Sequence, residues 1–143
     1  NQDYGSEKIL EIIKDFIKKK NFFYLKHLGQ QNYIDLAFHM NAIIGNSSSG
    51  LLEVPTFKKG TINIGNRQLG RLSADSVINC NPDRESISFA LRKLFSNKFK
   101  SQLANVVNPY GDGGASKIIL ETIENIKVEE IIKKRFYDYP ISN

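Results

Sequence analysis

The stretch of sequence that decides the fold is Ala42-Ile43-Ile44-Gly45-Asn46-Ser47-Ser48-Ser49-Gly50. Its first three residues form a short apolar run, which is typical of a buried strand. The small residues that follow predict a turn, and Leu51-Leu52-Glu53 after them predict the start of a helix. A strand that enters a helix through such a turn is characteristic of α/β proteins.

Strands and helices alternate along the rest of the chain. Helical spacing of apolar residues, and short apolar runs, indicate the further elements. The runs are continuously apolar and no Asn-Gly or Asp-Gly hairpin separates them, so we expect a parallel sheet with helices on both faces. Helices are expected around residues 9–17, 33–38, 87–95, 115–126 and 128–137, with Ser6, Asp83 and Asp112 as N-caps of the first, third and fourth, and further strands at residues 22–25, 61–64 and 76–78.

Composition indicates one globular domain of 143 residues, with 41% apolar and 24% charged residues. Cys80 is the single cysteine, so no internal disulfide can form and a cytoplasmic setting is expected. No apolar run approaches the roughly 20 residues that span a membrane. The net charge of +5 comes without a nucleic-acid-binding motif, so neither a membrane nor a nucleic acid is an expected partner.

Three consecutive serines between Gly45 and Gly50 exceed what a helix cap needs. Capping alone is the plain explanation, and phosphate binding is the alternative that we favour, because hydroxyl groups and free N–H groups of such a turn donate to anions. Ligands of parallel sheets bind outside the carboxyl ends of the strands. Residues 26–29, 45–50 and 65–71 each follow an expected strand, so they should lie along one edge.

Three charged residues add to this pattern. Glu53 follows Ser49 by four residues and therefore shares its helix face. Its carboxylate could simply interact with the helix dipole, or it could accept hydrogen bonds from a ribose diol, which would avoid repulsion by a phosphate. Arg67 and Arg71 lie on a glycine-bounded loop, which favours a bidentate phosphate contact by at least one of them over plain solvation.

Other chemistry finds little support in the sequence. Residues 108–114 contain several glycines but lack the P-loop lysine and the Rossmann glycine spacing. His27 and His39 have no partner at metal-ligand spacing, so neither a metal nor a cofactor is expected. No nucleophile–base pair or complete acid–base apparatus is evident, and the chain by itself is expected to be inactive.

The sequence resembles the UDP-N-acetylglucosamine 2-epimerases, in particular the hydrolysing branch that makes N-acetylmannosamine for sialic-acid-type sugars. The resemblance rests on four segments in the same order over nearly the whole chain. In one departure, Lys58-Lys59-Gly60 stands where the family commonly has Gly-x-Pro, so the shape of that loop is not carried over. The matching segments are Asn1-x-Asp3-x-Gly5, residues 44–50 with Glu53, residues 61–71 and residues 108–113.

The resemblance implies a GT-B architecture, in which two Rossmann-like domains face each other across a cleft. Residues 1–127 would form the UDP-binding domain, which is the C-terminal half of that fold. Residues 128–143 would include a last helix that crosses to an N-terminal domain outside this chain. The full-length enzyme would take a UDP-N-acetylhexosamine, eliminate UDP and hydrate the resulting glycal. We also expect a homo-oligomer, assembled through the apolar face of residues 128–137.

Carried over residue by residue, the resemblance implies a UDP site. The serine turn would hold the diphosphate, Glu53 the ribose and Arg67 the phosphates, while the backbone near His27 would meet the uracil. Two alternatives stay open: half of a GT-B glycosyltransferase, against which the arginine loop argues, and a non-catalytic UDP-sugar-binding module. The implied UDP-binding residues are Asn1, His27, Leu28, Ser47, Ser48, Ser49, Gly50, Glu53 and Arg67.

Overall fold

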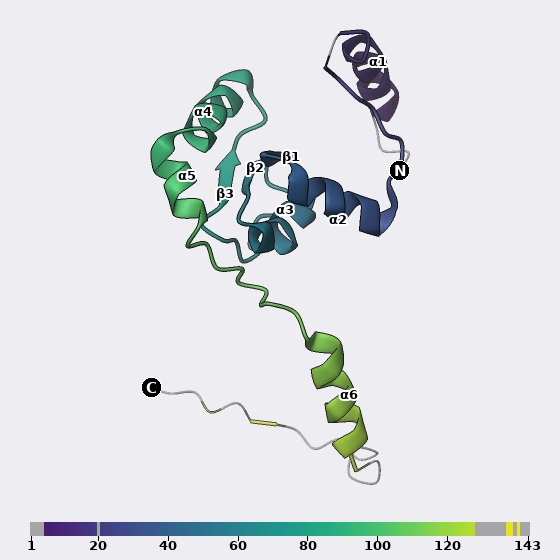
Figure 1. Cartoon of the computed structure of the whole chain (residues 1–143), viewed down its shortest axis with the longest axis vertical. Helices are drawn as coiled ribbons and strands as arrows, with labels where there is room; N and C mark the ends of the chain where they lie inside the picture. Colours follow the sequence, from purple (N-terminus) through teal and green to yellow (C-terminus); the bar gives the residue numbers. More distant parts are fainter. Residues whose placement is uncertain (1–4, 20, 128–136, 139, 141–143) are drawn as a thin grey trace. The chain divides into compact units, whose positions relative to one another are not determined.

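The computed structural model describes residues 5–19, 21–127, 137, 138 and 140. The chain divides into two compact units, residues 1–110 and residues 111–143 (Figure 1). The first unit contains the β-sheet, and the second contains α6 (Ala115–Asn125). No helix in these described ranges is long and apolar enough to cross a membrane. The segment expected to form a final helix, residues 128–137, lies almost wholly outside the described residues.

The sheet of the described chain has three parallel strands, β1 (Ala42–Gly45), β2 (Gly60–Ile64) and β3 (Val77–Cys80), in the order β1-β2-β3. The central strand β2 is almost wholly buried. This confirms the predicted α/β fold with a parallel sheet. The strand predicted at residues 22–25 is wrong, because that segment pairs with no strand of the described sheet and Phe23 is 92% exposed.

Helices cover both faces of the sheet. Successive side chains of a strand point to opposite faces, so Thr61 and Ile62 mark the two faces of β2. On the Ile62 face, α4 (Arg84–Leu94) and α5 (Asn97–Leu103) close a core that contains Leu94 and Phe99. Figure 1 shows these two helices on the side of the strands opposite to α2 (Gly29–His39) and α3 (Ser49–Leu52).

On the Thr61 face, the short helix α3 packs directly on the sheet. The hydroxyl of Thr61 donates to the main-chain oxygen of Gly50 over 2.9 Å. A 3-10 helix, η1 (Val54–Phe57), follows at once, and the ring of its Phe57 meets Phe38 of α2 edge to face, with 5.8 Å between centroids. The helix after the serine-rich turn is thus a single turn, so its dipole contributes less than the sequence pattern suggested.

One of the three predicted N-caps is confirmed. Asp83 accepts the N–H of Ser86 over 2.7 Å at the start of α4, and this bond, together with that from the Ser86 hydroxyl, lowers the pKa of the Asp83 carboxyl. The other two are wrong: Gly5 precedes α1 (Ser6–Phe16), and Gly114 rather than Asp112 precedes α6. Both glycines have a left-handed backbone that side chains disfavour, which outweighs the capping preference of a nearby Ser or Asp.

Lys58, where the sequence departs from the pattern of the family it resembles, also has an unusual backbone conformation. Lys58 adopts a left-handed backbone, with a φ of 55°, at the turn that enters β2. A non-glycine residue in this region is strained. The ammonium group of Lys58 donates to the main-chain oxygen of Val106, and this hydrogen bond offsets part of the strain.

Gly50 is required by the close approach of α3 to β2. A Cβ added at this position would lie 2.6 Å from Cγ2 of Thr61. Gly50→Ala should therefore lower the free energy of unfolding by about 1–3 kcal/mol in urea titrations, as overpacking does. Alanine otherwise favours a helix over glycine by about 1 kcal/mol, so a loss identifies the clash.

Thr61→Ser provides the matched control, because it deletes the clashing methyl group and keeps the hydroxyl that bonds to Gly50. The double variant Gly50→Ala/Thr61→Ser should be destabilised less, relative to Thr61→Ser, than Gly50→Ala is relative to the parent. Equal losses in the two backgrounds would show that close packing on Thr61 is not the reason for glycine here.

Candidate functional site

Two loops meet at the carboxyl ends of β1 and β2: the serine turn (residues 45–50) and the arginine loop (residues 65–71). Gly45 at the end of β1 pairs in register with Asn63 of β2. The amide nitrogen of Gln68, a residue only 6% exposed, donates to the main-chain oxygen of Asn46 over 2.8 Å. The structure therefore confirms for two of the three predicted segments that they lie along one edge of the sheet. The third, residues 26–29, follows no strand, because residues 22–25 form none.

The serine turn presents several hydrogen-bond donors without a partner. The N–H groups of Ser47 and Ser48 and the hydroxyl of Ser48 make no hydrogen bond with the described part of the chain. The hydroxyl oxygen of Ser47 accepts a long hydrogen bond, of 3.4 Å, from the N–H of Ser49. The hydroxyl proton of Ser47 therefore stays free to donate. Uncommitted N–H and O–H donors gathered on one short turn suit an anion.

Ser49 differs from its two neighbours. Its hydroxyl oxygen lies 2.5 Å from the hydroxyl oxygen of Tyr33 in α2. Gly50, the last residue of the turn, is buried against Thr61, so its close backbone packing serves the fold. The structure thus brings residues 47–50 together with α2 on one side and β2 on the other.

Glu53 directly follows α3, and its N–H donates to the main-chain oxygen of Ser49 over 3.0 Å. Its side chain is half-buried, and the buried oxygen Oε2 has no hydrogen-bond partner among the described residues. The same holds for Oε1 of Gln68. Leaving a buried acceptor unpaired costs about 1–3 kcal/mol, so a donor from outside the described chain is expected at each.

Arg67 lies in the exposed part of the arginine loop, between the two left-handed glycines Gly65 and Gly70. Its guanidinium makes no ion pair or hydrogen bond with any residue that the structure describes. Arg67 is therefore available to an anion held at the serine turn. Arg71 is exposed as well.

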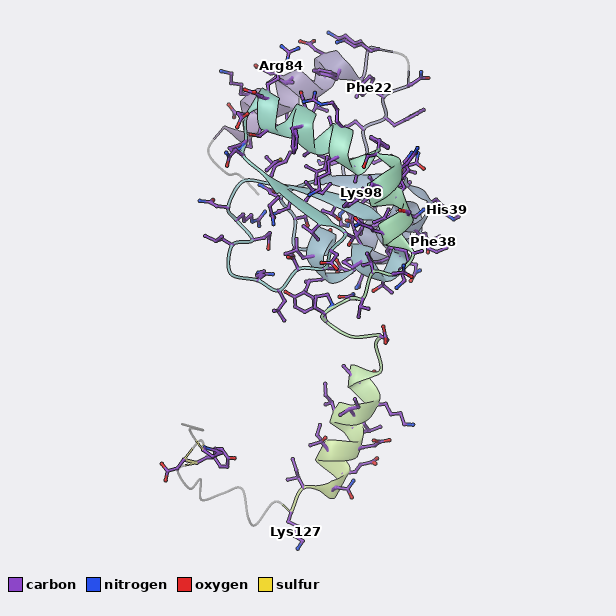
Figure 2. The ribbon with its side chains drawn as sticks, turned by 90° about the vertical axis from the view of Figure 1, so that its left-hand side faces the viewer. Phe22, Phe38, His39, Arg84, Lys98 and Lys127 are labelled. Carbon is purple, nitrogen blue, oxygen red and sulfur yellow. The ribbon has the colours of Figure 1, made fainter. Side chains whose placement is uncertain are left out.

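A pocket of about 370 Å³ lies at the start of α2 and is lined by residues 25–30 and Tyr33. His27 is exposed and Leu28 half-buried at its rim. The pocket connects with the serine turn through Tyr33, which lines the first and bonds to the second. Asn1, the remaining predicted site residue, lies outside the described residues. His39, at the far end of α2, packs against the ring of Phe38 with 5.2 Å between centroids (Figure 2).

Three residues of this region have roles that the sequence analysis missed. Gln68 ties the arginine loop to the serine turn, and Tyr33 contacts Ser49. Asn108, expected only in a loop, is buried and donates to the main-chain oxygen of Leu52 and the hydroxyl of Thr56, both over 2.8 Å. The available signal was that Gln68 and Asn108 fall inside two of the segments that carry the family resemblance, residues 61–71 and residues 108–113.

Comparison with known proteins reveals consistent relatives. A family model described as UDP-N-acetylglucosamine 2-epimerase matches residues 1–124. The polysialic acid biosynthesis protein P7 of Escherichia coli is 37% identical over 141 residues. The hydrolysing UDP-N,N'-diacetylbacillosamine 2-epimerase of Legionella pneumophila is 31% identical over 139 residues, and the hydrolysing GDP/UDP-N,N'-diacetylbacillosamine 2-epimerase of Campylobacter jejuni is 38% identical over 141 residues.

These alignments cover 98%, 97% and 96% of this chain, respectively, and 36% of each relative. The chain therefore spans about 36% of the length of the curated relatives that it matches. Because the family model covers most of the chain, and because the relatives align over nearly all of it, the chain belongs to the UDP-N-acetylglucosamine 2-epimerase family.

Proposed function

We propose that this chain is the UDP-binding part of a hydrolysing UDP-sugar 2-epimerase. The proposal rests on one observation: unpaired hydrogen-bond donors and an unpaired hydrogen-bond acceptor lie close together at the same site. The serine turn offers donors without acceptors, and Glu53, a few residues on, holds a buried acceptor without a donor. A ligand with both an anionic group and hydroxyl groups supplies what each lacks, and a nucleoside diphosphate is such a ligand.

The diphosphate would occupy the serine turn. Its oxygens would accept from the N–H groups of Ser47 and Ser48 and from the hydroxyls of the turn. Arg67, which has no partner in the described chain, would add a charge-assisted hydrogen bond. The hydrogen bond from Gln68 to Asn46 supports this arrangement, because it holds the two loops together.

The ribose would occupy the position beside Glu53. A carboxylate next to a diphosphate is repelled unless hydroxyl donors lie between them, and the two ribose hydroxyls are such donors. The pocket at residues 25–30 would then receive the uracil near His27 and Leu28. Its volume of about 370 Å³ exceeds that of a single pyrimidine ring, so the fit leaves room for solvent.

The whole protein would release UDP from a UDP-N-acetylhexosamine by elimination and then hydrate the resulting glycal. Two relatives named as hydrolysing 2-epimerases of UDP-linked diacetylbacillosamine support this reaction class. The acid and base groups would come from the part of the protein outside this chain. A cytoplasmic location, and a homo-oligomer assembled through residues 128–137, stay predictions.

The 143-residue chain should bind UDP and turn over nothing. Titration calorimetry should give measurable UDP binding, with weaker binding of cytidine and guanosine diphosphates. Incubation with UDP-N-acetylglucosamine should release no UDP, because the nucleotide ligands are present while a complete acid–base set is not. Release of UDP by the isolated chain would contradict this division of labour.

Pyrophosphate separates the roles of two side chains. Arg67→Ala should cost about 1.5–3 kcal/mol of binding free energy for both UDP and pyrophosphate, since it removes a charged phosphate contact. Glu53→Ala should weaken UDP binding, because it removes a ribose contact, and should leave pyrophosphate binding unchanged or somewhat stronger, because it removes a negative charge near the anion. Arg84→Ala, which deletes an exposed arginine of α4, is the matched control. Equal losses of pyrophosphate affinity in the Arg67 and Glu53 variants would exclude the ribose assignment.

A further inference from the structure

Tyr33 makes an unusual contact with the serine turn. It lies in the middle of α2, half-buried, and its hydroxyl oxygen is 2.5 Å from that of Ser49. The other described side chains that bond to the turn from outside it bond to main-chain atoms: Gln68 bonds to the oxygen of Asn46, and Thr61 to that of Gly50. Those bonds fix the backbone of the turn. Tyr33 instead contacts a side-chain hydroxyl, that of Ser49, which has a proton of its own.

The direction of this hydrogen bond decides where that proton goes. Either oxygen could donate on geometry alone. A phenol is more acidic than an aliphatic alcohol and is therefore the better donor, whereas the serine oxygen is the better acceptor. With Tyr33 donating, the proton of Ser49 is free to bond to another acceptor. With Ser49 donating, its proton would be consumed by Tyr33.

We propose that Tyr33 is a positioning residue for the diphosphate: its hydroxyl donates to Ser49 and thereby directs the proton of Ser49 to a phosphate oxygen. This inference rests on the proposed function and refines it. Tyr33 itself need not touch the phosphate. Tyr33 also lines the pocket at residues 25–30, so it links this pocket to the serine turn.

Tyr33→Phe tests this directly, because it deletes the hydroxyl and keeps the ring that lines the pocket. Calorimetry on the 143-residue chain should show UDP affinity two- to tenfold lower, roughly the effect of one neutral hydrogen bond. Pyrophosphate affinity should fall by the same factor, since the effect acts on the phosphate. A loss confined to UDP would place Tyr33 against the base and overturn the inference.

Tyr110→Phe is the matched control. Its hydroxyl donates to the main-chain oxygen of Leu72 over 3.0 Å, so the variant deletes a comparable bond in the same unit and should leave UDP affinity unchanged. Thermal unfolding of both variants reports their stability separately from binding. An equal loss of UDP affinity in the control would mean that the effect of Tyr33→Phe is general rather than positional.

Ser49→Ala completes a double-mutant cycle. If Tyr33 acts through Ser49, adding Tyr33→Phe to Ser49→Ala should cause no further loss of UDP affinity. Additive losses of UDP affinity in the double variant would contradict the inference. Parental UDP affinity in Ser49→Ala would contradict it as well, and this result is decisive even if Tyr33→Phe folds poorly. Failure of the parent chain to bind UDP would overturn the proposed function itself, whereas parental binding by Tyr33→Phe would overturn this inference alone.

Discussion

Parallel pairing of β1 with β2 is the constraint on which the rest of this structure depends. It brings the ends of two strands to the same edge, with Gly45 in register with Asn63, so the serine turn and the arginine loop must leave the sheet side by side. The Gln68–Asn46 hydrogen bond then joins the loops, and the contact of Gly50 with Thr61 holds the turn against the sheet. Contacts within the fold therefore position the donors of the turn.

That arrangement explains why a single helical turn suffices after the serines. A long helix would have supplied a large dipole, but α3 has four residues. The turn relies instead on individual N–H and O–H groups, which keep their direction because buried residues on two sides hold the backbone. Preorganised donors of this kind lose little freedom on binding, which is where their contribution to affinity originates.

The sequence predicted the parts of this fold that rest on local patterns. Apolar runs indicated the strands at residues 42–44 and 61–64, and the parallel sheet followed from their alternation with helices. The strand prediction for residues 22–25 was wrong because an aromatic run forms a strand only if a neighbouring strand pairs with it. The N-cap predictions for α1 and α6 were wrong because a left-handed glycine takes the N-cap position in place of the nearby Ser or Asp.

The residues of the candidate site likewise fall into two groups, those that the sequence indicated and those that only the structure reveals. Ser47, Ser48 and Glu53 stand out in the sequence because of their spacing, and the structure places them around one turn. Tyr33 and Gln68 do not stand out, because their partners lie 16 and 22 residues away and no periodicity links them. Side chains that position a site through tertiary contacts become visible only when the fold is known.

A nitrogen–proton NMR titration of the 143-residue chain with UDP tests the central claim most directly, since it reports on every main-chain N–H group. Saturating UDP should shift the amide signals of Ser47 and Ser48 most strongly and those of the arginine loop with them. Signals of α4, on the opposite face of the sheet, should stay in place. Shifts confined to α4, with the serine turn unchanged, would contradict the proposal that this turn holds the nucleotide.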